Sequence, residues 1–64
     1  MEDNYINGFS ILNEQNMMFD CFMYKNENES LYIDIIIRDF DHNYMTFRLQ
    51  EDDIDTLKKF LSLY

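Results

Sequence analysis

The clearest structural signal in this sequence is the segment LYIDIIIR, which spans residues 31–38. Four of its eight residues are isoleucines, whose β-branched side chains favour extended backbone. Alternate residues of a strand point to opposite sides of a sheet, so the odd-numbered residues form one wholly apolar side. They are Leu31, Ile33, Ile35 and Ile37. The segment therefore predicts a central β-strand with one side in the core.

Three other segments have strand character when the sequence is followed outward from residues 31–38. They are residues 5–12, 17–24 and 44–49. The same alternation gives them an apolar side, so we expect all four segments to share one apolar face. Its further members are Phe9, Ile11, Met17, Phe19, Cys21, Met23, Met45, Phe47 and Leu49. The Asn7-Gly8 pair in the first segment predicts a bulge or bend.

The end of the chain predicts one helix, from Gln50 or Glu51 almost to Tyr64. Apolar residues recur there at helical spacing, and acidic residues precede two lysines, which suits the helix dipole. The apolar residues are Ile54, Leu57, Phe60, Leu61 and Tyr64. We expect this helix to cover the apolar face. The predicted fold is α+β: a small antiparallel β-sheet of three or four strands with one C-terminal α-helix packed on one face. Residues 1–64 would form a single small acidic domain without internal repeats.

The size and charge of the chain restrict its function. It has 64 residues, with thirteen acidic against five basic ones and a formal net charge of -8. A domain this small buries only about 60% of the surface of its unfolded chain, so its stability is marginal. Cys21 is the only cysteine, which excludes an internal disulfide and favours a reducing compartment. Because no apolar run reaches transmembrane length and the first residues do not resemble a signal peptide, we expect a cytoplasmic protein.

No arrangement of residues predicts catalysis, a cofactor or a metal site, so we expect a protein that is not an enzyme. Asp39, Asp41 and Asn43 have the spacing that opens an EF-hand loop, but the required glycine and final glutamate are missing. We interpret this run as a polar hairpin turn and keep calcium as the lesser alternative. His42 is interpreted as an exposed turn residue, and Cys21 as a small buried apolar residue.

The other side of the sheet is half apolar and strongly aromatic, a composition that indicates an interaction surface. Aromatic residues are enriched at interface hot spots, so we expect partner-binding anchors there. The expected anchors are Phe22, Tyr24, Tyr32, Ile36 and Tyr44. The alternative is that the rings pack along the sheet as cross-strand pairs, with Asp34 beside Arg48 as a surface ion pair. A homodimer through this side is a further expectation, because twofold symmetry is the commonest.

The acidic residues predict a protein partner with a basic surface, because a net charge of -8 repels nucleic acid and anionic membranes. The expected charge contributors are Asp34, Asp39, Asp41, Glu51, Asp52, Asp53 and Asp55. We hypothesise a non-catalytic inhibitor that imitates nucleic-acid charge and docks on the nucleic-acid-binding surface of an enzyme. In bulk composition the chain resembles short acidic phage and mobile-element proteins, including anti-CRISPR and anti-restriction proteins. The alternatives are an immunity protein or antitoxin against a basic toxin, and a structural homo-oligomer or accessory subunit.

Overall fold

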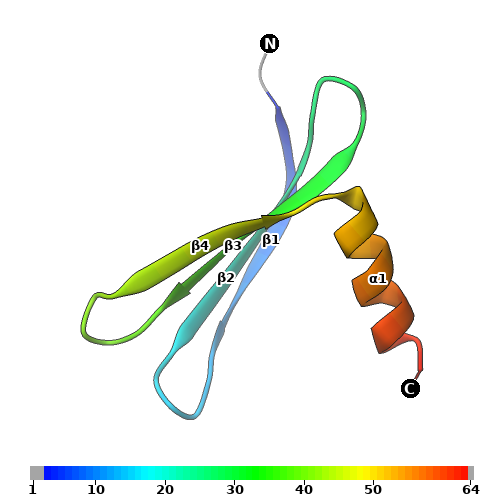
Figure 1. The fold of residues 1–64 in the computed structure, drawn as a ribbon. Helices are drawn as coiled ribbons and strands as arrows, with labels where there is room; N and C mark the ends of the chain where they lie inside the picture. The colour runs from blue at the N-terminus through cyan, green and yellow to red at the C-terminus, as the bar shows by residue number, and fades with distance from the viewer. Residues whose placement is uncertain (1–2, 64) are drawn as a thin grey trace.

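The strands form where β-branched and aromatic residues concentrate. Figure 1 shows the fold of the computed structural model, which describes residues 3–63. The elements are β1 (Asn4–Leu12), β2 (Met18–Lys25), β3 (Leu31–Arg38), β4 (Tyr44–Leu49) and α1 (Glu51–Leu61). Within residues 3–63 the sheet is an antiparallel meander in the order β1-β2-β3-β4. The predicted α+β fold is confirmed. Four bounds differ from the predicted ones, because β1 starts at Asn4, β2 runs from Met18 to Lys25 and α1 ends at Leu61. Tyr64 lies outside the described residues.

The three hairpin loops share one hydrogen-bonding design. Residues 13–17, 26–30 and 39–43 each begin with an Asn or Asp whose Oδ1 accepts from the backbone N–H groups two and four residues later. The fourth residue of each loop has a left-handed backbone, with φ of 61° at Asn16, 64° at Glu29 and 67° at His42. The loops therefore recur every thirteen residues.

Strand β1 carries a bulge beside Asn7-Gly8, as predicted. The β1–β2 register shifts between Tyr5 and Asn7, so Ile6 is the extra residue. A Cβ on Gly8 would lie only 2.8 Å from the Cys21 carbonyl oxygen and 2.9 Å from the Tyr5 hydroxyl. This close approach explains why a glycine stands there, and the bulge keeps the rest of β1 in the predicted alternation.

Helix α1 begins one residue after β4. The Gln50 backbone N–H donates to Asp53 Oδ2 at 2.9 Å, and acidic residues fill the first turn, where the helix dipole favours them. Ile54 is the buried side chain of this helix. No helix in the described part of the chain is long and apolar enough to cross a membrane.

The predicted apolar side of the sheet is present, and we call it the apolar face. Its register rows contain Phe9, Ile11, Phe19, Cys21, Met23, Ile33, Ile35, Ile37, Met45, Phe47 and Leu49. Among the described elements, α1 contacts only β3 and β4, and Figure 1 shows the helix diverging from the sheet. The buried apolar residues are accordingly few, namely Cys21, Tyr32, Ile35 and Ile54. The helix therefore covers much less of the apolar face than we expected.

Candidate protein interface

The side of the sheet opposite the apolar face carries the predicted anchors, and we call it the tyrosine face. It contains Tyr5, Phe22, Tyr24, Tyr32, Asp34, Ile36, Tyr44 and Arg48, with Ser10, Leu12, Asp20 and Arg38 toward one end. The Tyr5 ring meets Tyr24 edge-on with centroids 5.7 Å apart, and Tyr24 stacks on Tyr32 at 5.2 Å. The Arg48 guanidinium lies 4.1 Å from the centroid of the Tyr32 ring. The cross-strand packing that we kept as an alternative is therefore present.

Polar contacts hold the centre of this ring row. Arg48 donates to the Asp34 carboxylate from Nε at 2.6 Å and from Nη2 at 3.1 Å, which is the predicted ion pair. The hydrogen bond to Asp34 raises the pKa of Arg48. The Tyr32 hydroxyl donates to Asp3 Oδ2 at 2.5 Å, and this bond to a carboxylate raises the pKa of Tyr32 to about 12. Because Tyr32 is only 6% exposed, its ring is committed to contacts within the chain.

Asp20 is the buried carboxylate of the tyrosine face. The Ser10 hydroxyl donates to its Oδ1 at 2.5 Å, and the Arg38 guanidinium pairs with its Oδ2. The hydrogen bond from Ser10 is the largest influence and lowers the pKa of Asp20; burial opposes it, and Arg38 adds to the lowering. The ionised carboxylate thus joins side chains from β1, β2 and β3.

The loop at residues 39–43 is confirmed as a polar hairpin turn with His42 exposed. Asp39 Oδ1 accepts from the backbone N–H of Asp41 at 2.9 Å and of Asn43 at 3.0 Å. Partial desolvation raises the pKa of Asp39, but the hydrogen bonds from Asn43 and Asp41 outweigh it and leave the pKa below its usual value. The spacing that resembles an EF-hand is therefore explained by the turn itself.

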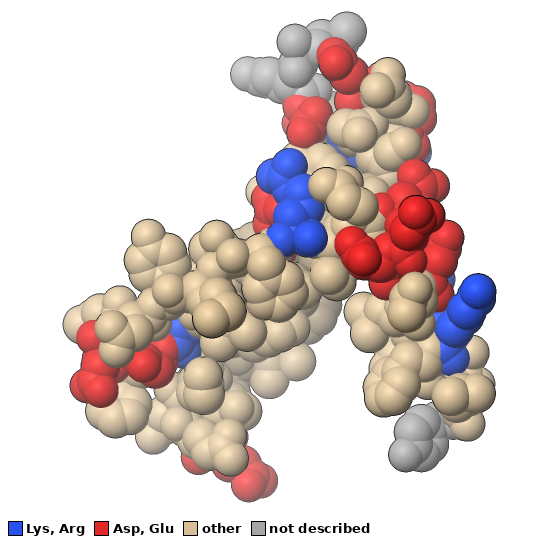
Figure 2. All heavy atoms as spheres, viewed as in Figure 1, with Lys and Arg blue, Asp and Glu red and all other residues tan. Residues whose placement is uncertain are grey.

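Those predicted partner-binding residues that are exposed lie at the two ends of the edge strand β4. Tyr44 is 71% exposed at its start, beside the exposed Asp41 of the preceding loop. At its other end the start of α1 carries Glu51, Asp52, Asp53 and Asp55. Figure 2 shows acidic side chains gathered over this helix start. A six-residue strand spans about 20 Å, so β4 separates two acidic regions by about that distance.

Most acidic residues in the described part of the chain have no salt-bridge partner. The salt bridges found among residues 3–63 join Lys25 to Glu29 at 3.3 Å, Arg38 to Asp20, and Arg48 to Asp34. Lys58 and Lys59 lie in the last turn of α1. Both arginines of the chain are thus used on the tyrosine face, and the helix start keeps its negative charge.

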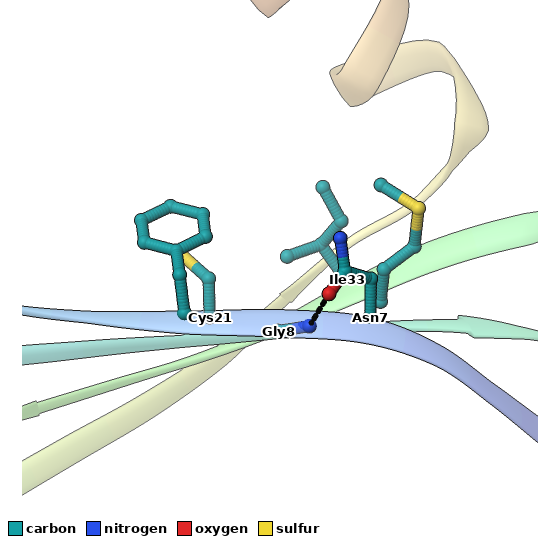
Figure 3. A pocket seen from close by; sticks show the side chains of 6 residues that line it. Asn7, Gly8, Cys21 and Ile33 are labelled. Carbon is teal, nitrogen blue, oxygen red and sulfur yellow. Dashed lines mark hydrogen bonds between the residues drawn. The ribbon is translucent and has the colours of Figure 1, made fainter.

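A hollow of about 130 Å³ opens on the apolar face beside the β1 bulge. It is lined by Asn7, Gly8, Phe9, Cys21, Met23 and Ile33. Figure 3 shows Cys21 and Ile33 pointing to the side of the sheet on which the helix lies. Burial and the nearby Asp20 charge raise the pKa of the Cys21 thiol, which makes it a poor nucleophile at neutral pH. The hollow is smaller than typical small-molecule sites of roughly 300–1,000 Å³, and it fits an apolar side chain.

Sequence reasoning missed two features of the surface. Phe40 is 72% exposed at the tip of the loop before Tyr44, and only its place between two aspartates in a turn could have indicated this. The second is that the apolar face remains open, which no local pattern shows. No family model, curated protein or solved structure matches this chain. Its function is therefore argued from its own residues.

Proposed function

We propose that this chain is a non-catalytic binding protein, an acidic inhibitor that docks on the basic nucleic-acid-binding surface of a target enzyme. The observation that carries the proposal is the separation of charges. Arg38 and Arg48 are held in ion pairs on the tyrosine face, whereas the acidic helix start has no such partner in the described chain. An uncompensated acidic region attracts a basic groove and accelerates encounter with it.

The two ends of β4 are the surfaces that we assign to this contact. The acidic start of α1 supplies most of the charge, and Asp41 adds charge at the other end. Tyr44 and Phe40 are the aromatic side chains best exposed to act as anchors there. Of the residues predicted from the sequence, Tyr32 and Asp34 instead support the sheet, since both have partners within the chain. The proposal places the protein in the cytoplasm, where such enzymes act.

A charge-matched pair of variants tests the location of the contact. The helix-start variant combines Glu51→Gln, Asp52→Asn and Asp55→Asn, and it retains Asp53 because that side chain caps Gln50. The control variant combines Glu14→Gln, Glu27→Gln and Glu29→Gln in the β1–β2 and β2–β3 loops. Both variants lose the same net charge, so any difference between them reports position. The Lys25–Glu29 pair lost in the control is exposed and contributes little.

The measurement is capture on the immobilised wild-type chain from a lysate of the source organism, followed by mass spectrometry and an assay of the captured protein. We expect a basic nuclease, helicase or similar enzyme, released by rising salt and inhibited by the wild-type chain. The helix-start variant should bind at least about tenfold more weakly, a loss of about 1.4 kcal/mol, while the loop control binds nearly normally. Equal binding by both variants, or binding insensitive to salt, would contradict the proposal. Capture of a toxin would instead identify an immunity protein.

A further inference from the structure

The apolar face is open over most of its area. At the β1 edge Phe9 and Ile11 are exposed, and at the β4 edge Met45 and Phe47 are exposed. Its three central register rows contain no charged side chain, and Lys25, opposite Leu31, lies at the end of the face. A large contiguous apolar surface that is exposed marks an interaction site in most soluble proteins.

The helix adds to this open surface instead of closing it. Ile54, Leu57 and Leu61 lie at helical spacing on one side of α1, and Ile54 is buried against the sheet. Leu57 and Leu61 point the same way but remain exposed, because α1 diverges from the sheet beyond its first turns. Figure 2 shows the sheet and the helix as separate lobes with uncharged surface between them.

The excess exposed area matches what one partner of a stable dimer buries. The chain exposes 5557 Å², whereas a monomeric protein of 7.9 kDa exposes about 4,400 Å². The excess is about 1,100 Å², and each partner in a standard interface contributes about 800 Å². The radius of gyration is 13.4 Å, against about 10.7 Å for a compact domain of this length. The large exposed area and the large radius of gyration both describe a domain whose apolar surface is only partly covered.

We propose that a second copy of this chain covers the apolar face, giving a twofold homodimer in which the two sheets face each other and the exposed side of α1 joins the interface. A basic partner meets no acidic side chain in the central rows of this face, whereas a second copy presents the same apolar rows. The two net charges of -8 then stay outside the contact. Apolar sheet faces pack about 10 Å apart in such sandwiches. The dimer leaves the start of α1 and the tyrosine face free, and it is independent of the proposed inhibition.

Sedimentation equilibrium on the purified wild-type chain tests the proposal directly. We expect the mass to rise from 7.9 kDa to twice that value over about a hundredfold range of concentration, with a parallel rise in Tm. Added NaCl should leave the association unchanged or strengthen it, because salt screens the repulsion between two acidic chains. Binding to a basic enzyme responds to salt in the opposite direction, so the two proposals fail separately. A constant mass of one chain, or assembly beyond a dimer, would overturn this proposal.

Neighbouring residues of β1 provide a matched pair of variants. Ile11 is 50% exposed on the apolar face, and Leu12 is 63% exposed on the tyrosine face. Ile11→Lys should weaken dimerisation at least about a hundredfold because it buries an unpaired charge, while Leu12→Lys leaves it unchanged. If Ile11→Lys does not fold by circular dichroism, Met45→Lys with Tyr44→Lys as control gives the same comparison on β4. Disruption by the tyrosine-face variant alone would assign the dimer to that face and refute the proposal.

Discussion

The Asp20 carboxylate on β2 is 3% exposed and pairs with the Arg38 guanidinium on the neighbouring strand β3. This is the most buried charge of the described salt bridges, and the Ser10 hydroxyl from β1 supports it from the other side. Ser10, Asp20 and Arg38 thus form a polar cluster that links three strands near the end of the sheet where the β1–β2 loop lies.

This polar cluster makes the free energy of unfolding sensitive to acid. The folded pKa of Asp20 is lowered, first by Ser10 and then by Arg38, so the stabilisation is present above the unfolded pKa of about 3.9 and is lost as pH falls through the folded value. We expect the free energy of unfolding in urea to fall below about pH 4. Asp20→Asn should show a weaker decline, with Asp39 supplying the remainder because its pKa is also lowered. Parallel pH profiles for both proteins would contradict this role.

The contact between Tyr32 and Asp3 predicts an abnormal phenol titration. The hydrogen bond to the carboxylate favours the protonated phenol and raises the pKa of Tyr32 to about 12, so its stabilisation is complete below about pH 10 and is lost as pH rises toward 12. One of the five tyrosines should therefore ionise late when absorbance at the phenolate band is followed against pH. Asp3→Asn should shift that titration to lower pH. An unchanged titration in the variant would show that the contact is absent in solution.

A side chain at Gly8 should destabilise the fold. In Gly8→Ala the new Cβ meets the Cys21 carbonyl oxygen and the Tyr5 hydroxyl, and the first of these is backbone that cannot turn aside. We expect a loss of about 1–3 kcal/mol in urea unfolding. Adding Tyr5→Phe removes only the hydroxyl contact and should restore little of that loss. Full restoration would show that the flexible tyrosine, not the backbone, sets the requirement for glycine.

The left-handed residues of the hairpin loops offer a gain in stability. His42 has φ of 67°, a left-handed backbone conformation that glycine adopts with less strain than histidine. His42→Gly should raise the free energy of unfolding by up to about 1 kcal/mol, because relief of left-handed strain exceeds the entropy cost of glycine. Phe40→Gly in the same loop is the control and should lower stability, since Phe40 has no positive φ. The reverse order of the two Tm values would contradict the assigned turn geometry.

The first residue of each loop allows a second test of the same design. Asn26 Oδ1 accepts backbone hydrogen bonds from Asn28 at 2.9 Å and Ser30 at 3.0 Å. Asn26→Ala should cost about 1 kcal/mol in urea unfolding, whereas Asn26→Asp should retain the turn because Asp39 performs the same task. Equal losses in both variants would show that these bonds do not stabilise the hairpin.

Much of the fold is readable from the sequence because it depends on local patterns. Alternation in LYIDIIIR identified β3 and the apolar face, and helical spacing identified α1. The Asp34–Arg48 pair was also predictable, since short loops in a meander restrict which residues lie opposite one another. The thirteen-residue recurrence of the loops was not, because no loop position has the same residue in all three loops.

The candidate site was less predictable, because exposure depends on residues distant in the sequence. Tyr32 was expected to be a partner-binding anchor, but its hydroxyl reaches Asp3 and its ring lies between Tyr24 and Arg48. Tyr44 points to the same side of the sheet as Arg48 but remains exposed, because it lies at the far end of an edge strand. Alternation assigns a side of the sheet and says nothing of what packs against it.

Sequence alone determined the strands, the helix, the side on which each residue points and the excess of acidic charge. These follow from side-chain period, turn chemistry and composition, which are properties of neighbouring residues. Tertiary structure decided that the apolar face remains open. A single residue, Gln50, joins β4 to α1, and burial of Ile54 anchors the first turns of the helix. The direction of the helix depends on the whole fold, so the surface left for a second copy becomes visible only in three dimensions.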